Sequence, residues 1–100
     1  MDRLTDWAEG LLCPAILCDP SGKILYRNAA AKRCRMAGRT GLSLLPLLPE
    51  ADAAEYVSAA SGRRCTILAV PAEDGERQVL LCPVALERER LTLLLGYAML

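Results

Sequence analysis

The 100-residue sequence contains no histidine and no phenylalanine, and it has one tryptophan and three tyrosines. Histidine is the commonest general base, a frequent transition-metal ligand and the usual axial ligand of haem, so its absence argues against all three roles. The serines have no histidine to activate them, and no pair of acidic residues has a catalytic spacing, so we expect no enzymatic activity. With aromatic residues at 4% of the chain, a stacking platform for single-stranded nucleic acid is also missing.

The sequence also lacks an excess of charge of either sign. Lysine plus arginine and aspartate plus glutamate each number 12, so nothing attracts nucleic acid or an anionic membrane over long range. A local basic patch, Lys32, Arg33, Arg35 and Arg39, is interpreted as a solvated helix face rather than a phosphate site. The apolar stretch 91–100 is too short to cross a membrane, which takes about 20 residues. The N-terminus is no signal peptide, and we expect a cytoplasmic location.

Close cysteine pairs are absent as well. The five cysteines are Cys13, Cys18, Cys34, Cys65 and Cys82, and no two have the C-x-x-C spacing of zinc sites and redox dithiols. We therefore interpret them as free thiols, packed as small hydrophobic side chains in a reducing compartment. A thiol-based redox sensor is the alternative, and Cys34 between Arg33 and Arg35 has the electropositive setting that activates a thiol.

The remaining sequence, 53% hydrophobic, predicts one small domain. Leu4, Trp7, Ala8 and Leu11 recur at helical spacing, which predicts an amphipathic helix over 2–12. Strands are predicted over 15–19 and 23–27, joined by the turn Asp19-Pro20-Ser21-Gly22. Asn28 then has the side chain to end the strand and cap a helix that runs to Met36 and stops at Gly38.

The second half of the chain alternates between short helices and longer strands. The segment 41–49 has room for a turn or two of helix, and a clear helix follows over 49–62 with Ala53, Ala54, Val57 and Ala60 facing inward. Strands are predicted over 65–71, 77–86 and 91–99. Asp74-Gly75 forms the first hairpin turn and the charged segment 87–90 the second connection.

This order resembles the PAS domain, a sensory fold of bacterial signalling proteins. The likeness rests on Asp19, Gly22, Ile24, Tyr26 and Asn28 in the first hairpin, and on the Gly-x-x-Leu-x-x-Leu-x-Pro pattern of 41–49. It implies an α+β fold with a five-stranded antiparallel sheet and short helices on one face. An N-terminal amphipathic helix (1–12) would precede the PAS core (13–100).

The resemblance also implies a role in detecting or relaying a signal. We expect a fragment of a longer protein, a sensor histidine kinase of a two-component system, in which this domain is covalently linked to an output domain. The alternatives are a transcriptional regulator, a cyclic-dinucleotide enzyme or a thiol-based redox sensor.

Two PAS cofactors are argued against by particular positions. Haem-binding members use a histidine, which this chain lacks, and the flavin photoreceptor motif would need cysteine where the chain has Leu44. We therefore expect no cofactor, and either a small apolar ligand or none. The candidate pocket residues between sheet and helices are Ile16, Tyr26, Leu44, Leu47, Val57, Leu68 and Leu80. The alternative is that the alanines of the long helix simply allow it to pack closely on the sheet.

The last strands are apolar on both faces, whereas an antiparallel sheet with one wet face alternates apolar and polar residues. One amphipathic helix is too narrow to cover five strands, so we expect a homodimer through this helix and the outer face of the sheet. The alternative is a monomer in which the chain's own helix and a C-terminal flank cover this surface. The candidate interface residues are Leu4, Trp7, Leu11, Leu94 and Ala98.

Overall fold

The computed structural model describes residues 2–73, 75–86 and 88–96 and confirms the expected α+β architecture. A five-stranded antiparallel sheet has the order β2-β1-β5-β4-β3, so the last strand lies at its centre. The elements are α1 (Asp2–Glu9), β1 (Ala15–Cys18), β2 (Ile24–Arg27), α2 (Ala29–Arg33), the 3₁₀ turn η1 (Leu45–Leu47), α3 (Glu50–Gly62), β3 (Thr66–Ala72), β4 (Gly75–Leu86) and β5 (Glu89–Gly96).

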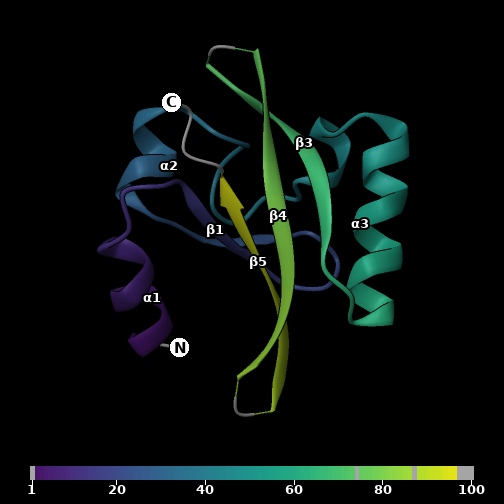
Figure 1. Ribbon diagram of the computed structural model, residues 1–100, viewed down its shortest axis with the longest axis horizontal. Helices are drawn as coiled ribbons and strands as arrows, with labels where there is room; N and C mark the ends of the chain where they lie inside the picture. The colour runs from purple at the N-terminus through teal and green to yellow at the C-terminus, as the bar shows by residue number, and fades with distance from the viewer. Residues whose placement is uncertain (1, 74, 87, 97–100) are drawn as a thin grey trace.

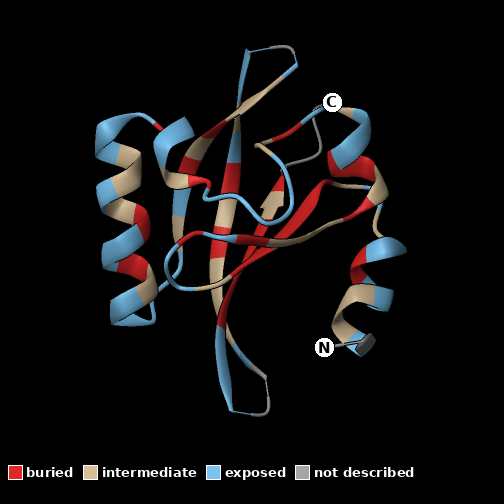
Figure 2. Cartoon of the chain, turned by 180° about the vertical axis from the view of Figure 1, so that it is seen from behind, coloured by how far each residue is buried: buried red, intermediate tan, exposed pale blue. Residues whose placement is uncertain are grey.

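The helices are distributed over both faces of the sheet. Figure 1 shows α3 beside β3 and α1 on the opposite side of the view, close to the start of β1. The inner face, under α3, η1 and the segment after α2, carries the main core, which includes Ile16, Ile24, Met36 and Tyr56. The outer face carries a smaller cluster around Leu17, Leu91 and Leu93. In Figure 2 the buried residues concentrate along the middle of the sheet.

Asn28 connects α1, β1 and α2 through its side chain, and its predicted role as the cap of α2 is confirmed. Its side-chain oxygen accepts from the N–H of Ala31, which caps α2, and also from the N–H of Ala15, both at 2.9 Å. Its amide nitrogen donates to the carbonyls of Ala8, at 2.8 Å, and Cys13, at 3.0 Å. The fully buried side chain therefore has four partners, as a polar group inside a core requires.

The helix ends differ from the sequence prediction. The helix expected to reach Met36 ends at Arg33, and Arg35 and Ala37 adopt left-handed backbone conformations. Tertiary hydrogen bonds cause this early end, because Ala37 N–H donates to the carbonyl of Pro71 and Glu73 N–H donates to that of Cys34. The segment thus pairs with the far end of the β3–β4 hairpin instead of continuing its helix.

The two hairpin glycines behave as their turns require. Gly22 has φ +91° and Gly75 has φ +113°, in the region that other residues avoid. Gly22 also has no room for a side chain, because a Cβ there would lie 2.8 Å from Leu45 Cγ. Among the helices of the described ranges, none is long and apolar enough to cross a membrane.

Candidate functional site

The interior between α3 and the sheet is filled by side chains. Of the candidate pocket residues, Ile16, Leu44 and Leu68 do meet there, and each is at most 1% exposed. Tyr56, which the sequence reading did not place inside, is fully buried among them. These three candidates therefore pack as core.

The other four candidates do not face this interior. Leu47 and Val57 are 46% and 47% exposed, while Tyr26 packs with the outer-face cluster. Leu80 points the same way as Tyr26, because it alternates with the inward-facing Val79 and Leu81. The error for Val57 has a simple cause: residues one apart on a helix point in different directions, and Tyr56 takes the inward position.

The predicted interface residues do not all lie on the outer face of the sheet. Leu4 packs on the outer-face cluster, Leu11 is half-buried and Trp7 is 50% exposed. Leu94 was placed on the wrong face, because it alternates with Leu93 and lies fully buried in the main core. Ala98 lies outside the described residues.

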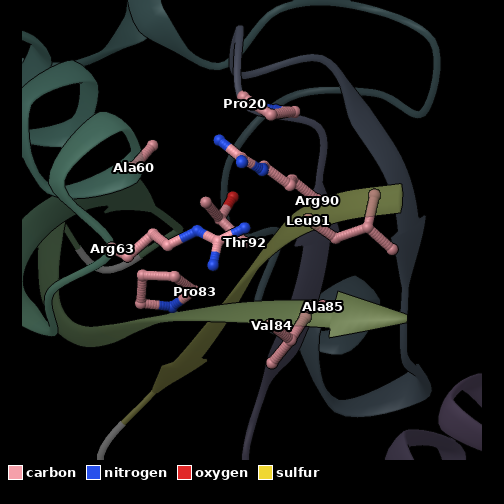
Figure 3. Close-up of a pocket in the computed structure, with 9 residues that line it drawn as sticks. All are labelled: Pro20, Ala60, Arg63, Pro83, Val84, Ala85, Arg90, Leu91 and Thr92. Atoms are coloured by element: carbon pink, nitrogen blue, oxygen red, sulfur yellow. The ribbon is translucent and has the colours of Figure 1, made fainter. Parts of the chain in front are cut away.

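A cavity of about 130 Å³ opens at the end of the sheet where α3 meets the β4–β5 hairpin. We call it the arginine cavity, because Arg63 and Arg90 both extend into it from different elements (Figure 3). Its lining residues are Pro20, Ala60, Arg63, Pro83, Val84, Ala85, Arg90, Leu91 and Thr92.

Local backbone structure sets the position of each arginine. Arg63 is the C-cap of α3 and holds a left-handed conformation with φ 53°. The helix ends at Gly62, as the sequence predicted, and the left-handed position directly after it is taken by a non-glycine residue, which is strained there. Arg90 pairs with Ala85 in the β4–β5 hairpin and shares the inward side of β5 with Thr92 and Leu94.

The two guanidinium groups have no acidic partner in the described part of the chain. The described ion pair joins Arg64 to Glu55, at 2.7 Å, on the outside of α3. Arg63 and Arg90 are both exposed overall, so the cavity is open to solvent. Two like charges that share one hollow repel each other, and an anion between them would relieve that repulsion.

A hydrogen-bonded chain connects the arginine cavity to the core. Thr92 Oγ1 contacts the hydroxyl of Tyr56, which donates to the carbonyl of Asp19 at 2.8 Å. Asp19 in turn organises the β1–β2 turn, because its carboxylate accepts from Ser21 N–H at 2.9 Å and from Lys23 N–H at 3.0 Å. The cavity, α3 and the first hairpin are therefore joined through three side chains.

Burial keeps two groups next to this chain of hydrogen bonds, Cys18 and Tyr56, in their protonated forms. Burial raises the pKa of the Cys18 thiol to about 12, so it stays protonated. Burial, and then the neighbouring Cys18, also raise the pKa of Tyr56, whose hydroxyl remains a donor. The cavity itself presents two guanidinium groups, which donate hydrogen bonds and accept none, so the site is suited to binding an anion rather than to proton transfer.

Neither arginine was predicted as a site residue from the sequence. Arg90 was assigned to the charged connection 87–90, and Arg63 was treated only as the residue that follows the helix over 49–62. The period-2 alternation of the last strand held a signal for Arg90, because extending the inward positions Leu94 and Thr92 backward reaches it. Arg63 had no comparable signal.

The fold is shared with solved structures. The PAS domain of an HTR-like protein from Haloarcula marismortui is 21% identical, with a TM-score of 0.69 over 98% of this chain and 96% of that one. The PAS domain of nitrogen regulation protein NR(II) from Vibrio parahaemolyticus is 12% identical, with a TM-score of 0.66 over 96% and 97%. The RpfR quorum-sensing receptor PAS domain from Cronobacter turicensis, solved in complex with BDSF, is 14% identical, with a TM-score of 0.62 over 90% and 96%. No family model and no curated protein matches the sequence.

Proposed function

Because the chain has the PAS fold, we propose that it is a sensory module whose arginine cavity binds a small organic carboxylate. The observation that carries this proposal is the convergence of Arg63 and Arg90 on one open cavity without a described acidic partner. Arginine binds carboxylates with two parallel charge-assisted hydrogen bonds, which gives both affinity and orientation.

The walls and the size of the cavity indicate which carboxylates would fit. Ala60, Pro20 and Pro83 are apolar and suit a short carbon chain, whereas Thr92 at the back of the cavity is buried and its hydroxyl already has protein partners. A volume of about 130 Å³ is below the usual range for drug-sized ligands, about 300–1,000 Å³. This favours a mono- or dicarboxylate of a few carbons over both alternatives from the sequence, a small apolar ligand or no ligand.

The signal would leave the site through the chain of hydrogen bonds below it. A carboxylate held by Arg63 and Arg90 would lie beside Thr92, which lines the cavity, and would alter its contact with Tyr56, and through Tyr56 the carbonyl of Asp19 at the end of β1. We infer that the receiver of this signal is a covalently linked output domain, with a histidine kinase as the expected parent. The RpfR PAS domain, solved with BDSF, offers a precedent for a ligand-bound domain of this fold.

A thermal-shift screen tests the proposal. The probes are acetate, malonate, succinate and inorganic phosphate, and a native-state ligand raises Tm with its concentration. We expect a dicarboxylate to raise Tm in the wild type and in Arg88→Ala, a control on the β4–β5 turn, but much less in Arg90→Ala. No shift with any carboxylate would refute the proposed ligand class, and a shift with phosphate alone would replace it.

We also propose that the domain forms a homodimer through the outer face of its sheet. Two large apolar side chains there, Trp7 on α1 and Ile67 on β3, are 50% and 52% exposed. Between them Leu80 and Leu95 are half-buried and α1 covers the cluster around Leu17, so an apolar band extends from α1 to the β3 edge. A second copy of this chain offers a matching apolar band.

A further inference from the structure

Cys65 and Cys82 lie next to each other across the β3–β4 hairpin. The register pairs Thr66 with Leu81, and the next pair outward in an antiparallel ladder is Cys65 with Cys82. The Cys65 thiol is also near enough to Cys82 to contribute to the raised pKa of the Cys82 thiol. Residues directly opposite in an antiparallel pair have Cα atoms about 4.5–5.5 Å apart, and a disulfide spans about 4.4–6.8 Å.

The pair also occupies a definite place beside the arginine cavity. Cys65 follows Arg63 by two residues, and Cys82 directly precedes Pro83. Arg63 and Pro83 both line the cavity. A bond between the cysteines would therefore join the two backbone segments that carry opposite parts of its wall.

We propose that Cys65 and Cys82 are a modification site, at which a hydroperoxide forms a reversible cross-strand disulfide. Cys65 is exposed and reacts first, while Cys82 is half-buried beside it and resolves the product. Burial, and then the neighbouring Cys65 thiol, raise the pKa of Cys82, so the buried partner is the poorer nucleophile toward a reagent from solution.

The two steps balance in atoms and electrons. The Cys65 thiolate attacks one peroxide oxygen, the S–O bond forms, the O–O bond breaks, and the other oxygen leaves as an alcohol or water after taking a proton. Cys82 sulfur then attacks the sulfenic sulfur, the S–S bond forms, and hydroxide leaves as water with the Cys82 proton. Two thiols lose two electrons, and the peroxide gains them.

Peptide mapping of the intact chain tests this inference independently of any ligand. Trypsin cleaves after Arg64, Arg77 and Arg88, which puts Cys65 in the peptide 65–77 and Cys82 in 78–88. After one equivalent of hydrogen peroxide and alkylation of the remaining thiols, we expect these two peptides joined and two hydrogens lighter than their sum. Dithiothreitol should separate them.

Matched variants identify the role of each thiol. Cys82→Ser should leave Cys65 as a sulfenic acid that a cyclic diketone captures, whereas Cys65→Ser should leave Cys82 largely unoxidised. Cys34→Ser, at a half-buried thiol elsewhere, should form the same cross-link as the wild type. The inference is overturned if the 65–77 and 78–88 peptides stay separate, or if the cross-link joins two molecules.

Discussion

The side-chain amide of Asn28 donates to the carbonyl oxygen of Ala8, 20 residues earlier, at a distance of 2.8 Å. The same side chain binds β1 and caps α2, so one buried residue fixes the N-terminal helix against the first hairpin. The placement of α1 on the sheet therefore depends on a polar contact as well as on Leu4.

Asn28→Ala should lower the free energy of unfolding by about 2–4 kcal/mol. The variant loses a helix cap, and it leaves buried backbone groups without partners at a cost of about 1–3 kcal/mol each. Asn28→Asp retains the acceptor but puts a carboxylate against two carbonyl oxygens. It should therefore lower the free energy of unfolding by at least as much as Asn28→Ala does. Urea unfolding measures both, and an Asn28→Asp protein as stable as the wild type would contradict this account of the junction.

Arg63→Gly should separate stability from binding. Glycine adopts the left-handed C-cap conformation without the steric cost of a side chain, so the free energy of unfolding should rise by about 1 kcal/mol. Carboxylate affinity should nevertheless fall about tenfold or more, because a charge-assisted hydrogen bond contributes about 1.5–3 kcal/mol. Calorimetric titration and urea unfolding of the same sample check the pair of changes. Unchanged affinity would remove Arg63 from the site.

Tyr56→Phe should lower the free energy of unfolding by about 1–2 kcal/mol, because the carbonyl of Asp19 loses its hydroxyl donor. The control is Tyr26→Phe, which removes a contact with Glu9 at the exposed surface and should cost less. Equal effects of the two substitutions would mean that the buried hydrogen bonds below the arginine cavity stabilise the fold no more than the exposed contact does.

Glu55 should contribute to the acid sensitivity of the domain. Its hydrogen bonds to Arg64, and then to Thr66, lower its pKa from 4.5 to about 2. A lowered folded-state pKa means that the contribution is complete above pH 4.5 and is lost as the pH falls toward 2. Glu55→Gln should therefore differ from the wild type in its urea midpoint at pH 7 and converge with it near pH 2. Midpoints that stay equally far apart at pH 7 and pH 2 would contradict this role of Glu55.

The outer face of the sheet should mediate dimer formation. Light scattering at about 100 μM should give the mass of a dimer, and Ile67→Glu should shift it toward the monomer. Val57→Glu is the matched control, because Val57 is similarly exposed but lies on α3, over the other face. A wild-type monomer at this concentration would rule out the proposed dimer.

Local signals in the sequence predicted the fold well, because they act over a few residues. The Asp19–Gly22 turn and the Asn28 cap needed only their neighbours. The end of α2 depended on a hydrogen bond between Ala37 and Pro71, which no local pattern contains.

The candidate sites depended on register and on helix rotation. An error of one residue in the rotation of α3 placed Val57 on its inward face, where Tyr56 lies. The interior that was expected to hold a pocket is filled by this side chain and the rest of the core. The pairing of Cys65 with Cys82 was accessible in principle, since both are equally distant from the β3–β4 turn, but it required the hairpin register rather than the spacing of a motif.

The most direct test of the arginine cavity is an NMR titration that follows the side-chain Nε–H signals of the arginines. With the dicarboxylate that raises Tm most, the signals of Arg63 and Arg90 should shift together and fit one Kd, while that of Arg39 stays in place. Added salt should weaken this Kd, because both contacts are charged and open to solvent. Unmoved Arg63 and Arg90 signals, with shifts confined to the backbone amides around Ile16 and Leu68, would place the ligand in the core and contradict the account.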